Sequence, residues 1–200
     1  MPVASKPLGR RERNKQAKLE RITAAASALF AEHGVDEVTT QQIAEAADIG
    51  TGTLFLYVRT KAELLLLVQN AHYAAALERG RAAAAREATA VDAVVALLEP
   101  VVACNRVQVD NGRTYLREMV FGDPSEPHRA AALDIVGQTE EATAGLLAQH
   151  LGLDETEAAV LARVISAILF LTMASSEHVG SSVEEVLGVI RAQVAEILPH

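Results

Sequence analysis

Apolar residues recur at intervals of three and four along most of the chain. One face of a first helix is marked by Leu19, Ile22, Ala26 and Phe30. Gly34 follows, where a left-handed cap would end this helix. Helical spacing continues through the remaining two-thirds of the chain, without the alternation typical of half-buried β-strands. The pattern predicts an all-α protein of about nine helices.

Two short helices are predicted next. Thr39, followed three residues later by Gln42, has the spacing of a capping box that opens a helix over residues 40–47. Residues 48–50 then form a tight turn, in which Gly50 is free to adopt a positive φ. Two short helices joined by a turn and braced by a longer helix make a helix-turn-helix unit.

The second short helix, over residues 51–58, has the composition of a DNA-reading helix. Its inward side is Leu54 and Val58, which leaves Phe55 and Tyr57 pointing outward or sideways, where a soluble protein rarely places them. Threonine hydroxyls can bond base edges or phosphates, and apolar side chains can contact thymine methyl groups. The alternative is that Phe55 and Tyr57 pack against the first helix.

Longer helices are predicted beyond this unit. Thr60 and Glu63 have a second capping-box spacing, which opens a long helix. Pro100 lies inside the next apolar helix and predicts a kink there. Residues 110–112 have the composition of a turn. The remaining helices are predicted over 113–121, 127–151, 155–178 and 183–198.

The charge is divided unevenly along the chain. The formal net charge is −8, but residues 1–61 carry +2 and residues 62–200 carry −10. Residues 1–21 alone carry +5. Because the acidic body repels polyanions, a polyanionic partner would be reached through the basic end. A nucleic-acid arm and a solvated terminus that keeps the protein soluble both explain this end.

Composition excludes several other classes of protein. Half of the 200 residues are apolar, but only 4% are aromatic and none is Trp, which favours packed helices over a β-sandwich or barrel. The single cysteine, Cys104, excludes an internal disulfide and indicates a reducing compartment, with a small buried apolar role favoured over redox sensing. No secretory signal or apolar run long enough to span a bilayer is found, so we expect a cytoplasmic protein without a membrane partner. Unpaired histidines and the lack of a glycine-rich phosphate loop predict no catalytic site, metal site or cofactor.

Three stretches carry a family resemblance. They are the helix end at residues 29–34, the Thr-x-x-x-Ile-Ala-x-x-Ala stretch at 39–47 and the segment GTLFLYVRTKAEL at 52–64. Together they resemble the DNA-binding domain of TetR/AcrR-family transcriptional regulators, over about a third of the chain. Gly50 stands where family members often have Ser, and Val58 stands where Phe is common.

The resemblance implies a basic flexible arm over residues 1–14, a helix-turn-helix DNA-binding domain over 15–61, and a larger helical effector-binding and dimerisation domain over 62–200. The residues implied to contact phosphates or the minor groove are Arg10, Arg11, Arg13, Thr40, Thr53, Tyr57 and Lys61. The residues implied to lie at or beside the bases are Gln41, Thr51, Gly52 and Phe55.

Two late helices predict a homodimer. The run at residues 160–171 is apolar on nearly every side, and such a helix must be covered all round. With the last helix it is expected to form a four-helix interface between two copies, the alternative being a buried helix at the centre of a monomer. The residues expected at this interface are Val160, Val164, Ile168, Leu171, Val186, Ile190 and Val194. A twofold dimer predicts a palindromic operator.

The resemblance also implies a pocket for a small molecule, and the predicted kink at Pro100 is the place expected for it. The residues expected near the pocket are Tyr73, Cys104, Gln108, Tyr115, Glu118, Met119, Phe170 and Met173. The apolar content of the domain suggests a hydrophobic or amphipathic effector.

The resulting hypothesis is a sequence-specific homodimeric repressor that such a ligand releases from double-stranded DNA. A ligand-independent regulator or activator of the same fold is one alternative. A small-molecule-binding protein or enzyme whose head no longer reads DNA is another. A non-specific chromosome-coating protein is disfavoured by the acidic body.

Overall fold

The computed structural model describes residues 9–199, which form nine α-helices, one short 3₁₀-helix and no strand. This confirms the all-α prediction. The helices are α1 (Arg10–His33), α2 (Thr40–Ala46), α3 (Thr51–Leu54), α4 (Lys61–Ala84), α5 (Ala90–Arg106), α6 (Val109–Phe121), α7 (Pro127–Leu151), α8 (Glu155–Ala174), the 3₁₀-helix Ser176–His178 and α9 (Val183–Ile197).

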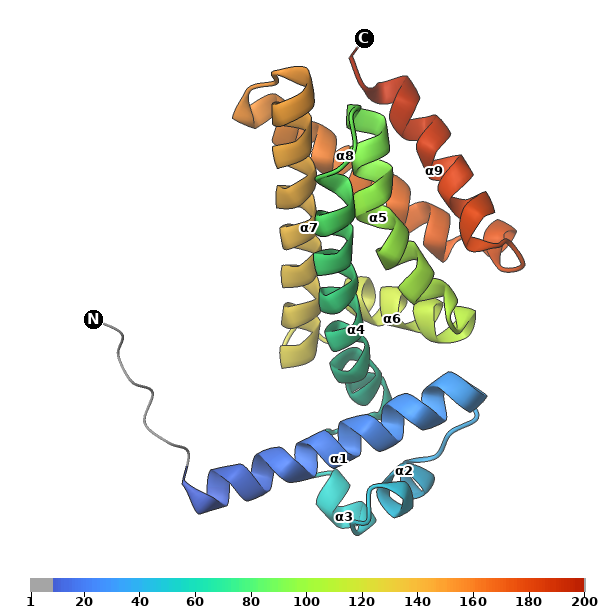
Figure 1. Ribbon diagram of the computed structural model, residues 1–200. Coiled ribbons are helices and arrows are strands. Elements are labelled where there is room, and N and C mark those ends of the chain that lie inside the picture. The colour runs from blue at the N-terminus through green and yellow to red at the C-terminus, as the bar shows by residue number, and fades with distance from the viewer. Residues whose placement is uncertain (1–8, 200) are drawn as a thin grey trace.

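The helices form a small head and a larger body (Figure 1). In the head, α1 lies across the foot of the body, with α2 and α3 on its far side. Helix α4 leads out of the head and packs mainly against α5 and α7, while α9 covers α5 and α8. One cluster of buried residues extends from the head, at Ile22 and Leu54, through Leu65 to Ile190 in the last helix. Head and body therefore share a continuous apolar core.

Local capping explains the boundaries within the head. The predicted capping box is present, since Gln42 N donates to Thr39 Oγ1 at 3.2 Å and Thr39 N donates to Gln42 Oε1 at 2.8 Å. Helix α1 ends at Gly34 as predicted, with φ of +81° but an extended ψ of 154° rather than a left-handed one. The positive φ after α2 belongs to Asp48, at +53°, and not to Gly50, so that prediction is wrong.

The second helix of the predicted unit is shorter than expected. Helix α3 ends at Leu54 and the chain continues as a turn over residues 55–57, although Leu54 and Val58 are both buried as predicted. At the start of α4 the second capping box is only half formed. Glu63 N donates to Thr60 Oγ1, but the Glu63 carboxylate accepts from Arg59 N instead of Thr60 N.

Helix α6 contains residues that composition assigns to a turn. Asp110 and Asn111 lie in its first turn because the Gln108 side chain caps it, accepting their backbone N–H groups at 2.8 and 3.1 Å. The predicted turn at residues 110–112 is therefore wrong. Helix α5 runs as one element across Pro100.

Helices α4 and α5 approach each other closely at Gly80. A Cβ added there would lie 2.1 Å from the backbone oxygen of Leu97, a contact that only a shift of one helix could relieve. We therefore expect Gly80→Ala to destabilise the protein by about 1–3 kcal/mol in thermal unfolding. Gly145→Ala, in α7 with no atom within 4 Å of the added Cβ, is the control and should stabilise by about 0.5–1 kcal/mol. Equal effects of both changes would refute the close approach.

Candidate DNA-binding surface and ligand cavity

The turn after α3 exposes apolar side chains on the outer side of the head. Phe55 is 48% exposed and Leu56 is 83% exposed, while Tyr57 is half-buried and packs against the core. Packing within the protein, the alternative to a DNA contact, is therefore observed for Tyr57 and not for Phe55. Leu56 was not among the expected contact residues.

The other expected base contacts lie beside this turn. Gly52 and Gln41 are exposed, and Thr51 and Thr53 are half-buried. Gln41 Nε2 donates to Glu45 Oε1 at 2.9 Å, so its amide is held along α2. These residues are therefore carried by α2 and α3, next to the exposed turn in the chain.

The expected flexible arm is helical where the structure describes it. Arg10, Arg11 and Arg13 are exposed in the first turn of α1, while residues 1–8 lie outside the described part of the chain. This corrects the arm, which was expected to extend to residue 14. The helix extends back to residue 10 because the Arg, Glu, Lys and Gln residues at its start are strong helix formers.

A broad groove lies between the first turns of α1 and the turn at residues 55–57, which we call the recognition turn. Five polar or charged residues of α1 besides Glu12 line one side, and three residues from α3 and its turn line the other. They are Arg10, Arg11, Asn14, Lys15 and Lys18 with Thr53, Leu56 and Tyr57. Lys15 and Lys18 were missed, although their spacing from Arg11, four and seven residues on, places them on the same helical face. We refer to these eight residues as the basic groove.

Lys61 and Thr40 sit further round the head. The Lys61 ammonium donates to the backbone oxygens of Asp36 and Val38 at 3.1 and 3.0 Å. Lys61 therefore holds the loop between α1 and α2. The sequence predicted only a phosphate contact for this residue. Thr40 is half-buried as the first residue of α2.

The body contains an apolar cavity of about 260 Å³ between α4, α5, α6, α7 and α8. Five of the expected ligand residues line it: Tyr73, Tyr115, Met119, Phe170 and Met173. The other three do not. Cys104 and Gln108 line a second cavity against α1 and α4, and Glu118 lines a third near the start of α7. The prediction placed these three residues in the cavity because they are close to Pro100 in sequence. It is wrong because different sides of α5 and α6 face different cavities.

Two stacked tyrosines form the polar end of this cavity. The rings of Tyr73 and Tyr115 lie 4.6 Å apart. Tyr73 OH accepts a hydrogen bond from Asn105 Nδ2 at 2.9 Å, and Tyr115 OH donates to Asn70 Oδ1 at 2.8 Å. Burial raises the pKa of both phenols well above the ordinary value, so both stay neutral. Asn105 Oδ1 is buried and has no partner among residues 9–199.

An ion pair lies at the rim of the same cavity. Arg163 of α8 and Glu140 of α7 are 3.6 Å apart, and the Arg163 side chain is 82% exposed. Neither was expected near a ligand, since no local spacing relates residues on different helices.

Burial raises the pKa of the Cys104 thiol to about 11, which leaves it protonated at neutral pH and disfavours redox sensing.

The two helices expected at a dimer interface differ in their exposure. On α8, Val160, Val164 and Leu171 are exposed at 59%, 41% and 69%, and Ile168 is half-buried. On α9 the prediction is wrong, because three residues lie fully buried within the protomer, where α9 packs against α5 and α8. They are Val186, Ile190 and Val194.

Among residues 9–199, α8 is the one helix long and apolar enough to cross a membrane by length and composition. Such evidence from a single helix is weak, because the core helix of a soluble protein passes the same test. Its buried side packs against α6, α7 and α9, which is how a core helix behaves.

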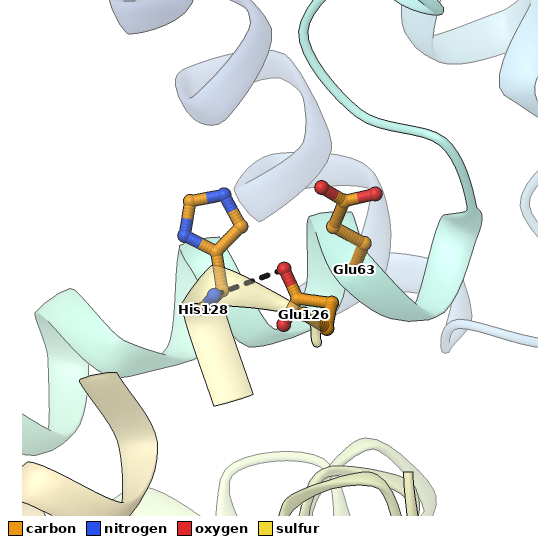
Figure 2. Close-up of side chains that lie close together, drawn as sticks. All are labelled: Glu63, Glu126 and His128. Carbon is orange, nitrogen blue, oxygen red and sulfur yellow. Dashed lines mark hydrogen bonds between the residues drawn. The ribbon is translucent and has the colours of Figure 1, made fainter. Parts of the chain in front are cut away.

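The structure also brings together three potential metal ligands, although the sequence predicted no metal site. Figure 2 shows Glu63 of α4 beside Glu126 and His128 at the start of α7. One donor atom of each residue lies within 4.8 Å of the others. Glu63 and Glu126 are 63 positions apart in the chain, which explains why no sequence spacing indicated the cluster.

Comparison with known proteins identifies the fold. Residues 22–68 match the family model of bacterial regulatory proteins, tetR family. No curated protein matches the chain in sequence. FadR from Thermus thermophilus, a TetR-family transcriptional repressor in complex with lauroyl-CoA, is 24% identical, with 91% of this chain and 96% of that chain covered and a TM-score of 0.70.

Two further solved structures have the same fold. A TetR transcriptional regulator from Rhodococcus sp. RHA1 is 17% identical, covers 92% and 97% of the two chains and has a TM-score of 0.64. The fatty acid degradation regulator FadR from Bacillus halodurans is 15% identical, covers 98% and 100%, and has a TM-score of 0.60. The helix-turn-helix head of this chain therefore matches the tetR-family model, and the fold of residues 9–199 is that of TetR-family transcriptional regulators.

Proposed function

We propose that this protein is a cytoplasmic homodimeric repressor that binds a palindromic operator and leaves it when an apolar or amphipathic ligand enters the cavity of the body. The observation that carries this proposal is the outer face of the head. There the exposed Phe55 stands next to Leu56 of the basic groove, on a protein whose residues 62–200 carry a net charge of −10. A TetR-family fold favours a regulator over an enzyme.

Two sets of residues in the head contact different parts of the DNA. Thr51, Gly52, Phe55 and Gln41 face the base edges, where hydroxyl, amide and apolar groups discriminate between base pairs. The cations of the basic groove, with Thr40, Thr53, Tyr57 and Lys61, contact phosphates and set the position of the head on the duplex. Lys61 also keeps the α1–α2 loop in place.

Dimerisation places two such heads on one operator. The exposed stripe of Val160, Val164 and Leu171 on α8 is the face that a second copy covers. Large apolar side chains exposed along one helix favour association. A twofold axis beside α8 would present the recognition turns to successive major grooves, about 34–36 Å apart, and hence to a palindrome.

The cavity favours a ligand with a flexible apolar chain. Its lining is almost entirely hydrocarbon, and its volume of about 260 Å³ is small compared with the roughly 300–1,000 Å³ of pockets that enclose drug-sized ligands. It can therefore hold a chain such as a fatty acyl group, with a polar head group outside at Arg163 and Glu140. The lauroyl-CoA bound by the similar Thermus FadR agrees with this ligand class.

Helix α6 connects the cavity to the head. Tyr115 and Met119 line the cavity, and one turn before them Asn111 bonds the backbone of the head at Phe30 and Val35. A ligand that displaces Tyr115 or Met119 would move Asn111 and with it α1. The protein has one conformation whose head spacing fits the operator and another whose head spacing does not. Release follows if the ligand binds the second conformation more tightly than the first.

The test of this function is selection of genomic fragments by the purified full-length chain. We expect enrichment of one palindromic sequence, bound with two protomers per duplex by mass measurement. An enriched site without twofold symmetry would overturn the dimer, and no enrichment would indicate a head that does not read DNA. A reporter gene behind the enriched site distinguishes repression from activation.

Filling the cavity should abolish the ligand response and leave DNA binding intact. Ser166 lines the cavity, and a phenyl ring in its place would occupy the space of an acyl chain. We expect Ser166→Phe to weaken lauroyl-CoA binding at least tenfold in calorimetry. Cys104→Ser, in the second cavity, is the matched control and should bind as the unmodified protein does. Equal loss in both variants, or in neither, would place the ligand elsewhere.

A further inference from the structure

The cluster of Glu63, Glu126 and His128 lies where the head meets the body. Glu63 is in the first turn of α4, directly after the head, and the other two residues begin α7 (Figure 2). The two carboxylates are buried, with 6% and 7% of each residue exposed, and His128 is half-buried. Two buried carboxylates that face each other repel unless a cation lies between or beside them.

Backbone hydrogen bonds fix both carboxylates in position. Glu126 caps α7, its Oε1 accepting from His128 N at 2.9 Å and its Oε2 from Arg129 N at 2.5 Å. Glu63 Oε2 accepts from Arg59 N at 2.5 Å. Each of these oxygens retains a second lone pair. Both carboxylates are therefore kept in the cluster before any ion binds, while small side-chain rotations stay open to them.

Other donor atoms in the cluster have no partner. Within the described part of the chain, neither ring nitrogen of His128 makes a hydrogen bond, and Glu63 Oε1 accepts none. A ring nitrogen and a carboxylate oxygen with no protein partner are what a metal ion requires of its ligands.

The nearby guanidinium groups neutralise the cluster only in part. Arg59 Nε lies 3.7 Å from Glu63 Oε2, but 61% of the Arg59 side chain is exposed. Arg129 directs Nη2 to the backbone oxygen of Val120 at 3.1 Å. An adjoining cavity of about 370 Å³ is lined by Glu63 and Glu126 and also by Glu118 and Asp123. Arg117 pairs with Glu118 at 3.3 Å, so four carboxylates face three guanidinium groups and one negative charge remains in excess.

We propose that Glu63, Glu126 and His128 bind a divalent transition-metal ion of the Zn²⁺ class. Two carboxylate oxygens and one imidazole nitrogen are a donor set found at zinc sites, whereas Mg²⁺ and Ca²⁺ select oxygen ligands alone. Bonds of about 2.0–2.2 Å require donor atoms roughly 3.4 Å apart in a tetrahedron. Side-chain rotation that brings the donors in from their separations of up to 4.8 Å suffices. Water from the adjoining cavity supplies the fourth ligand.

A metal ion here would tie α4 to α7 at the point where the head is attached. The same junction reaches the ligand cavity, because His128 O accepts from Asn70 Nδ2 and Asn70 Oδ1 accepts from Tyr115 OH. Metal binding would thus stiffen the joint through which the ligand acts. The site itself does not depend on the proposed DNA-binding function.

The experiment is calorimetric titration of the tag-free, full-length chain with Zn²⁺. We expect one ion per protomer, at least tenfold weaker binding in His128→Gln and Glu63→Gln, and no binding of Mg²⁺ at the same concentration. His178→Gln, which removes a histidine of the 3₁₀-helix, is the matched control and should bind as the unmodified protein does. Glu126 is left unchanged because it caps α7.

Thermal unfolding provides a second readout that does not require the variants to bind metal. Zn²⁺ should raise the melting temperature of the unmodified protein and of His178→Gln, but not that of His128→Gln. Unchanged affinity in both cluster variants, equal loss in the His178 control, or binding of Mg²⁺ with the same affinity would each overturn the site.

Discussion

Asn111→Leu is expected to lower the free energy of unfolding by about 2–4 kcal/mol, the largest effect of any single substitution considered for this protein. Asn111 is 2% exposed and joins the body to the head with both ends of its amide. Oδ1 accepts from Val35 N at 2.6 Å, and Nδ2 donates to the backbone oxygen of Phe30 at 2.7 Å. Leucine has a similar volume but leaves both buried backbone groups without this partner, although Phe30 O keeps a bond from Gly34 N.

The control for this prediction is Gln108→Ala. It removes the cap of α6 but leaves the Asn111 bridge, so it should cost about 1 kcal/mol. Both variants are compared by urea unfolding and, below the transition, by operator affinity. If Asn111→Leu cost no more than the loss of the cap, the bridge would not be a structural link between head and body.

The second large effect is expected in DNA binding. Replacing Arg10, Arg11 and Lys15 of the basic groove by alanine should leave three phosphates per head without a cationic partner. The dependence of log affinity on log salt should then become shallower by about 0.9 for each such phosphate, roughly 2.7 per head. Affinity should fall for all sequences alike, because phosphates carry no base identity. Anisotropy titrations at several salt concentrations measure both quantities.

A matched triple variant in the body controls for net charge. Arg86, Arg113 and Arg117 lie outside the basic groove, so their replacement by alanine removes the same charge without altering the salt dependence. A shallower salt dependence in the body variant, or an altered base preference in the groove variant, would contradict the assignment of the groove to phosphates.

Local signals in the sequence were sufficient for much of the fold. The capping box of Thr39 and Gln42 and the helix end at Gly34 act between residues close in the chain, so their pattern alone predicts the boundary. The prediction failed at residues 110–112 because the Gln108 side chain overrides their turn-forming composition. Gln108 is the N-cap residue of α6, which begins at Val109. Local propensity is a weak prior when a capping group stands beside it.

Long-range packing explains the failures at the candidate sites. The apolar stripe of α9 indicated that this face is buried but not by what, and α5 and α8 of the same protomer cover it. Cys104 and Tyr115 are close in sequence, yet they line different cavities because different sides of α5 and α6 face different cavities. Glu63 and His128 meet only through the packing of α4 against α7. Pattern and spacing show which face of a helix is buried, but not which element covers that face.

The central claim is that the head of this protein reads a DNA sequence. The most direct measurement is fluorescence anisotropy with labelled DNA flanking the protein's own gene, in salt steps and with excess random competitor DNA. The account predicts a complex that weakens as salt rises but persists against the competitor, since specific sites are bound roughly 10³-fold or more tighter than random ones. Loss of the complex to random competitor, repeated with the fragment recovered by genomic selection, would contradict it.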